Sequence, residues 1–309
     1  MRATSTLTMA GLATLLAVPA WAGEVSPLVD TDWLSSKMGN ENLVILDIRN
    51  RIDGGSAEIF AEGHIPGAVY SNYTEAGWRV ERDGIVGMLP PVENLEALIG
   101  GLGIDNDDHI VVVPAGVSSS DFGSATRVYW TFKVLGHDAV SILDGGYASW
   151  ASDPANEIAT GPSSPEPTVF KADFQGHLLA TQEDVATALA TGDALLIDAR
   201  PEGQFTGAEK AGPVARAGTL RGAVNLQQQL LVDAEQQTAI EPDTLSTLLS
   251  ELEIPAEGDQ VAFCNTGHWA SIAWFAASEI GGNKSVSLYD GSMTQWTADA
   301  GNEVIKTAP

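Results

Sequence analysis

The chain has a single cysteine, Cys264, whose surroundings indicate a nucleophile. An apolar run at residues 261–263 leads directly into it, and apolar residues at helical spacing begin at Trp269. Cys264 is therefore expected at the carboxyl end of a strand and in front of a helix N-terminus, the crevice where open α/β sheets bind ligands. Unpaired backbone N–H groups at such a place favour the thiolate, which is the form of cysteine that attacks.

The residues that follow the cysteine provide groups that would hold an anionic sulfur. The backbone N–H groups from Asn265 to Trp269 are predicted to surround the sulfur, and the side chains of Thr266 and His268 to add hydrogen bonds. Gly267 fits a position whose backbone conformation is costly for other residues. A partly exposed His268 without a catalytic role is an equally good interpretation. Trp269 either forms a pocket wall or packs in the core.

Other kinds of reactive site are poorly supported. Residues 118–120 are three serines without a Gly-x-Ser-x-Gly elbow, so we expect an ordinary polar loop there. A cysteine phosphatase clamps phosphate with an arginine six positions after its cysteine, and that position is Ala270. Five scattered histidines without partner cysteines argue against a metal site. A buried, inert cysteine is the remaining alternative.

Two halves of the chain repeat one pattern, and the second half carries Cys264. Each half opens with an apolar run that ends in Asp-x-Arg, at residues 44–49 and 195–200, with Asp47 and Asp198 separated by 151 residues. Such runs are typical of strands buried on both faces of a parallel sheet. Each run is followed by a second strand, a helix and a third strand: 110–113, 124–135 and 140–143, then 261–263, 270–280 and 286–289. The sequence therefore predicts an α/β fold of two tandem domains, each a parallel sheet flanked by helices.

The chain divides into four segments. We expect a signal peptide at 1–22, a non-catalytic domain at 23–152, a proline-rich linker at 153–170 and a catalytic domain at 171–309. The signal peptide is predicted from Arg2, an apolar run at 7–18 and an A-x-A site that would be cut after Ala22. An uncleaved membrane anchor is the alternative, but the run is shorter than the roughly 20 residues that a spanning helix needs. The mature protein is expected in the periplasm or outside the cell, without a membrane segment.

The charge of the chain limits its partners. Fifteen basic and 41 acidic residues give a net charge of −26. Nucleic acid is not expected as a partner, because binding it depends on clustered lysines and arginines. An anionic substrate would be repelled at long range, so a site for one must rely on groups within a screening length of about 8–10 Å.

These motifs together resemble the tandem-domain rhodanese family. The resemblance rests on Asp-x-Arg after the first strand, Gly-His-Ile-Pro-Gly-Ala at 63–68, Asp-Gly-Gly at 144–146 before a tryptophan, and a cysteine loop in the second half only. It covers residues from about 25 to 304. The resemblance implies that Cys264 carries sulfane sulfur as a persulfide from thiosulfate or 3-mercaptopyruvate to a thiol or cyanide. It implies a small-molecule sulfur donor, a thiol acceptor that is a small molecule or a redox protein, and no cofactor.

The sequence departs from this family at the positions that bind the donor. Thiosulfate-using relatives carry a basic residue where this chain has Thr266 and an arginine where it has Gln204. The loop typical of mercaptopyruvate enzymes matches Thr266 and Gly267 but not Asn265. The donor stays open, with a thiosulfate sulfurtransferase favoured over a 3-mercaptopyruvate sulfurtransferase.

Three arginines of the second half are candidates for the missing positive charge. Arg200 either contacts the donor or forms a structural ion pair with Asp198, and Arg216 and Arg221 are the candidates to replace the missing basic residue. Because the usual cations are absent, the alternative function is a non-catalytic sulfur carrier or partner-binding protein of the same fold. The expected donor-binding set is Asn265, Thr266, Gly267, His268, Trp269, Arg200 and Gln204.

Overall fold

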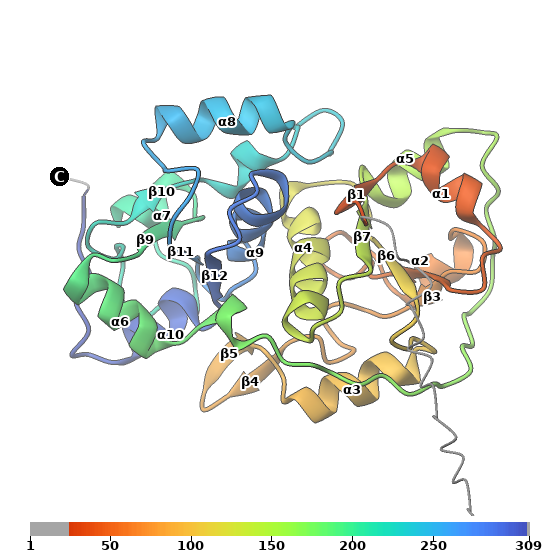
Figure 1. The fold of residues 1–309 in the computed structure, drawn as a ribbon, viewed down its shortest axis with the longest axis horizontal. Coiled ribbons are helices and arrows are strands. Elements are labelled where there is room, and N and C mark those ends of the chain that lie inside the picture. The colour runs from red at the N-terminus through yellow and green to blue at the C-terminus, as the bar shows by residue number, and fades with distance from the viewer. Residues whose placement is uncertain (1–24, 308–309) are drawn as a thin grey trace, which may run out of the picture.

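The computed structural model describes residues 25–307, so the predicted signal peptide lies outside the described residues. Two lobes lie side by side in the ribbon view of Figure 1, and each is built on a five-stranded sheet. The strand orders are β1-β7-β6-β2-β3 and β8-β12-β11-β9-β10, with every neighbouring pair parallel. The two orders correspond strand by strand, which confirms the predicted α/β fold and its duplication.

The elements of the first domain alternate between strands and helices. Its sheet contains β1 (Leu28–Val29), β2 (Leu43–Asp47), β3 (Val69–Tyr70), β6 (His109–Val113) and β7 (Val140–Leu143). Its helices are α1 (Thr31–Lys37), α2 (Ala57–Glu62), α3 (Val92–Gly101), α4 (Ser119–Val134) and α5 (Gly146–Ser152). An antiparallel hairpin that was not predicted from the sequence consists of β4 (Val80–Arg82) and β5 (Ile85–Met88).

The second domain repeats the sheet and its helices. Its strands are β8 (Leu179–Ala180), β9 (Leu195–Asp198), β10 (Val224–Asn225), β11 (Gln260–Phe263) and β12 (Val286–Tyr289). Its helices are α6 (Gln182–Thr191), α7 (Glu202–Thr206), α8 (Pro242–Glu251), α9 (Ala270–Phe275) and α10 (Ser292–Ala298). Short 3-10 turns lie at Gly176–Leu178 and Gln228–Leu231, and a π-helical turn at Ala276–Ile280 continues α9.

The start of α4 differs from the sequence prediction. The helix begins at Ser119, five residues before the expected start at 124, because the Ser118 side chain accepts a hydrogen bond from the Asp121 amide and caps it. The expectation of a polar loop at 118–120 is therefore wrong for Ser119 and Ser120, which occupy the first turn of the helix.

The two domains share a continuous hydrophobic core. Helices α4 and α9 lie next to each other at the centre of Figure 1, and the ring of Phe275 on α9 packs edge-on against Phe122 and Tyr129 of α4. The Tyr129 hydroxyl also donates a hydrogen bond to Glu279. Since this contact buries large aromatic side chains, the domains hold a fixed position relative to each other.

The segment predicted as a linker packs on the first domain. Ala159 forms an antiparallel bridge with His64, and the Ser163 hydroxyl accepts a hydrogen bond from the Tyr70 amide. These bonds hold the chain against the first domain before it enters the second.

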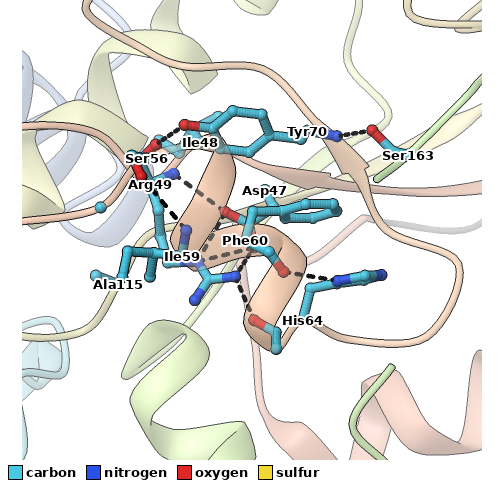
Figure 2. A network of polar contacts seen from close by, with 12 residues as sticks. Asp47, Ile48, Arg49, Ser56, Ile59, Phe60, His64, Tyr70, Ala115 and Ser163 are labelled. Carbon is cyan, nitrogen blue, oxygen red and sulfur yellow. Dashed lines mark hydrogen bonds and ion pairs between the residues drawn. The ribbon is translucent and has the colours of Figure 1, made fainter. Parts of the chain in front are cut away.

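The Asp-x-Arg motif forms the same buried ion pair in both domains. Arg49 pairs with Asp47 at 2.7 Å, and Arg200 pairs with Asp198 at 2.6 Å. Figure 2 shows the guanidinium of Arg49 between Asp47 and the end of α2, where its Nη2 donates to the Gly63 carbonyl. His64 lies beside it, stacked on Phe60 with 3.9 Å between ring centroids. In the first domain the motif therefore connects the end of β2 to the turn that follows α2, and His64 belongs to that turn.

Candidate active site

Cys264 lines a cavity between the two domains. It follows β11 directly and is only 1% exposed. The cavity measures about 320 Å³ and is lined by Ile52, Arg79 and Ser120 of the first domain and by Ala211, Pro213, Cys264, Asn265, Thr266, His268 and Trp269 of the second. A molecule that reacts with the sulfur would therefore approach it through this cavity.

The backbone of the cysteine loop (residues 264–269) is held by Ser292. The Ser292 hydroxyl accepts hydrogen bonds from the amides of Cys264 at 3.0 Å and Gly267 at 3.1 Å, and it donates one to the Tyr289 carbonyl. The amide of Gly267 is thus not available to an anion, which corrects the expectation that every amide from Asn265 to Trp269 would hold the sulfur.

Four amides of the cysteine loop remain for a ligand. Those of Asn265, Thr266, His268 and Trp269 meet no acceptor within residues 25–307. Amides grouped in this way next to a sulfur are partial positive charges that stabilise an anion. Ser292 was not predicted from the sequence, although it lies directly after the Asp-Gly pair that follows β12.

Gly267 has the left-handed backbone conformation that the sequence suggested for this loop, with φ of +72°. A Cβ atom at this position would collide with Nη1 of Arg127 and would lie 2.7 Å from the Asp290 carbonyl oxygen. Both the conformation and the space therefore require glycine.

Two arginines of the first domain donate hydrogen bonds to backbone carbonyl groups of the cysteine loop. Arg79 Nη2 donates to the Thr266 carbonyl at 2.6 Å, and Arg127 Nη1 donates to the Gly267 carbonyl at 3.0 Å. The fully buried Arg127 also forms an ion pair with Asp290 at 3.6 Å. Neither arginine was predicted, because no local motif reveals which residues of one domain contact a loop of the other.

His268 is buried and neutral, unlike either role considered from the sequence. Its Nε2 lies 2.8 Å from the Ser120 carbonyl, so Nε2 carries the proton, and Nδ1 then accepts a hydrogen bond from the Tyr73 hydroxyl at 2.9 Å. Burial, followed by the charge of Arg79, lowers the pKa of His268 to about 3. The ring therefore forms no imidazolium partner for a thiolate at neutral pH.

The remaining predicted residues divide into those near the cavity and those away from it. Trp269 lines the cavity and donates from Nε1 to the Ser120 hydroxyl, and Gln204 accepts a hydrogen bond from the Asn265 side chain at 2.8 Å. Arg200 does not line the cavity: it is 1% exposed and binds Asp198 and the Gly218 carbonyl, which favours the structural alternative.

The other two candidate cations also lie away from the sulfur. Arg221 pairs with Glu303, and Arg216 donates to backbone carbonyls that include those of Asp299 and Asn302. Within residues 25–307, no group of three or more His, Cys, Asp or Glu side chains could hold a metal ion.

The corresponding loop of the first domain holds a carboxylate of its own. It follows β6, and its amides at Ala115, Gly116 and Val117 donate to the side chain of Asp121. Asp121 is 1% exposed, and burial together with the charge of Asp53 raises its pKa to about 6. This loop therefore has an internal anion where the second domain presents a thiol.

A pH-dependent stability follows from the raised pKa of Asp121. Native Asp121 binds a proton more tightly than unfolded Asp121, so its contribution to stability is present at low pH and is lost as pH rises through about 6. An Asp121→Asn variant lacks this titration. We expect the free energy of unfolding of the wild type relative to this variant to fall by about 1–3 kcal/mol between pH 4.5 and 7.5. Urea unfolding across that range measures it, and parallel curves for the two proteins would contradict the assignment.

Comparison with known proteins identifies the family. The model of the rhodanese-like domain matches residues 30–153 and again 181–299. Thiosulfate sulfurtransferase of Mus musculus is 32% identical over 282 residues, covering 87% of this chain and 91% of the mouse protein. The 3-mercaptopyruvate sulfurtransferase of Homo sapiens is 30% identical over 281 residues, covering 89% of this chain and 86% of the human protein.

A solved structure agrees with these matches. The crystal structure of SseA from Escherichia coli, described as a 3-mercaptopyruvate sulfotransferase, is similar with a TM-score of 0.74 at 26% identity, covering 87% of this chain and 99% of SseA. The chain therefore belongs to the rhodanese family, with two rhodanese-like domains in tandem. Its curated relatives are sulfurtransferases, which supports sulfur transfer as its general activity.

Proposed function

We propose that this protein transfers sulfane sulfur from thiosulfate to a thiol or cyanide through a persulfide on Cys264. The observation that carries the proposal is the position of the only cysteine, which lines a cavity and is followed by four backbone amides that meet no acceptor within residues 25–307. These amides are placed to stabilise both the thiolate and the persulfide anion that replaces it.

The proposed reaction has two displacement steps. The Cys264 thiolate attacks the outer sulfur of thiosulfate, a sulfur–sulfur bond forms on the enzyme, and the donor's own sulfur–sulfur bond breaks to release sulfite. The terminal persulfide sulfur then passes to the thiolate of an acceptor or to cyanide, and the Cys264 thiolate returns. Charge balances in both steps, and no oxidant or cofactor is consumed.

The leaving group favours thiosulfate over 3-mercaptopyruvate as the donor. Sulfite leaves as a stable anion, whereas pyruvate leaves as an enolate whose carbon must gain a proton. Among the lining residues, His268 does not supply that proton, because its ring is neutral and its Nε2 proton is bound to the Ser120 carbonyl. A 3-mercaptopyruvate sulfurtransferase is therefore the second candidate for this site.

Intact-mass spectrometry tests the proposed intermediate. After incubation with thiosulfate and removal of the donor, we expect a mass gain of one sulfur atom, which cyanide removes. Because the chain has one cysteine, the added sulfur is assigned to Cys264 without further mapping. A parallel incubation with 3-mercaptopyruvate is expected to load the enzyme more slowly. Absence of the adduct with both donors would refute the persulfide proposal, and rapid loading without turnover would indicate a sulfur carrier instead.

We also propose that the protein acts after export, in the periplasm or outside the cell. The proposal rests on the sequence of residues 1–22, which lie outside the described residues. Within residues 25–307, none of the helices combines the length and the apolar character required to cross a membrane. Mass determination of the protein secreted by its host would test cleavage after Ala22.

A further inference from the structure

The cavity above Cys264 has one fixed positive charge, and the first domain supplies it. Among the lining residues, Arg79 and His268 are the basic ones, and His268 is neutral. The donor of the proposed function is a dianion, and it approaches a protein whose net charge is −26. Arg79 is therefore placed to offset a repulsion that otherwise opposes binding.

Arg79 is held in position by backbone groups and not by a carboxylate. Its Nε donates to the Gly87 carbonyl at 3.2 Å, and its Nη2 donates to the Thr266 carbonyl. No carboxylate within residues 25–307 forms an ion pair with Arg79, whereas Arg49, Arg127 and Arg200 each have one. Its charge is thus oriented but not neutralised.

The hairpin is shaped to admit this side chain. Gly87 on β5 has φ of +86°, and a Cβ atom there would collide with Nη2 of Arg79 and lie 2.8 Å from the Thr266 carbonyl oxygen. Only glycine has both the backbone conformation and the small size that residue 87 requires. The missing side chain leaves room for the guanidinium of Arg79 to reach the cysteine loop of the second domain.

We propose that Arg79 binds the anionic end of the sulfur donor and replaces, from the other domain, the basic residues that are absent at Thr266 and Gln204. This inference rests on the proposed function for the identity of the donor. A guanidinium can donate two parallel hydrogen bonds to a sulfonate or a carboxylate, which fixes the orientation of the donor as well as its affinity. The donor site is accordingly completed by both domains.

Kinetics of Arg79→Gln give the first test. We expect KM for thiosulfate to rise about 10- to 100-fold with kcat changed much less, since a hydrogen bond to a charged group is lost from donor binding. Because the variant keeps the repulsion by the net charge and loses the attraction by Arg79, its KM should fall more steeply than that of the wild type as ionic strength rises. Arg79→Lys, which keeps the charge, should recover part of the loss. The matched control is Arg82→Gln on β4, three residues further along the chain. This substitution changes the net charge by the same amount, but Arg82 does not line the cavity.

Alkylation gives a second test that does not require turnover. Iodoacetate and iodoacetamide have similar sizes, but only the former is an anion, and both modify the single cysteine. We expect Arg79→Gln to lower the iodoacetate-to-iodoacetamide rate ratio several-fold and Arg82→Gln to leave it unchanged. Equal loss of both rates would overturn the inference, because it would mean that Arg79 only supports the loop. An altered ratio in a protein that transfers no sulfur would support Arg79 as an anion site while rejecting the proposed function.

Discussion

Replacing Cys264 with serine is expected to abolish sulfur transfer, with a loss of at least about 10³-fold in kcat/KM from thiosulfate to cyanide. A serine hydroxyl does not ionise appreciably at neutral pH and cannot form a persulfide. The substitution is nearly isosteric, so the cavity and the amides of the cysteine loop should persist. Steady-state formation of thiocyanate measures the loss, and intact-mass spectrometry should find no sulfur adduct.

A matched control separates chemistry from the cost of burying a hydroxyl. Ala262 lies two residues earlier on β11 and is fully buried, so Ala262→Ser adds a buried hydroxyl without removing the sulfur. We expect this variant to lose some stability but to keep activity within a few-fold of the wild type. If Cys264→Ser were as active as Ala262→Ser, sulfur would pass directly between donor and acceptor, and the persulfide route would be wrong.

The architecture and the nucleophile could be predicted from the sequence because both depend on local patterns. Apolar runs that end in Asp-x-Arg predicted β2 and β9. An apolar run before Cys264 and a helical pattern after it predicted that the cysteine loop lies between a strand and a helix, which are β11 and α9. The hydrophobic period of a buried strand and the turn chemistry after it are properties of neighbouring residues.

The contacts that shape the site could not be predicted in the same way. Ser292, Arg79 and Arg127 reach the cysteine loop from 25 to 187 residues away in sequence. The periodicity of a sequence does not indicate which residue of one domain will contact a loop of the other. The sequence showed that two basic residues were missing, but it did not show that the first domain supplies a cation.

The first domain therefore contributes to the site although it has no nucleophile. Its own loop after β6 binds the carboxylate of Asp121, while its Tyr73, Arg79, Ser120 and Arg127 contact the cysteine loop. After the duplication, the two copies of the fold thus differ: one contains Cys264, and the other holds the loop that surrounds it.

We expect Gly267→Ala to disrupt the contacts between the first domain and the cysteine loop, although it adds only one methyl group. Alanine at residue 267 would have to keep the left-handed backbone conformation, which is costly for a residue with a side chain. Its Cβ atom would also collide with Arg127 and lie within 2.8 Å of backbone atoms of Asp290. Either Arg127 gives up the Gly267 carbonyl, or the loop moves and carries the amides of His268 and Trp269 with it. We expect a loss of about 2–4 kcal/mol in the free energy of unfolding and, because a shift of about 1 Å misplaces the reacting groups, a fall of about 10²-fold in kcat/KM.

Gly222 provides the matched control for Gly267→Ala. It also has a left-handed conformation, with φ of +76°, but a Cβ atom there would meet no atom within 4 Å. Gly222→Ala should therefore cost only about 1 kcal/mol from the backbone conformation and leave sulfur transfer intact. Urea unfolding and thiosulfate kinetics on both variants separate the two contributions. Equal stability losses with full activity in both would mean that the cysteine loop accommodates a side chain, and that contact with Arg127 and Asp290 does not fix the amides around the sulfur.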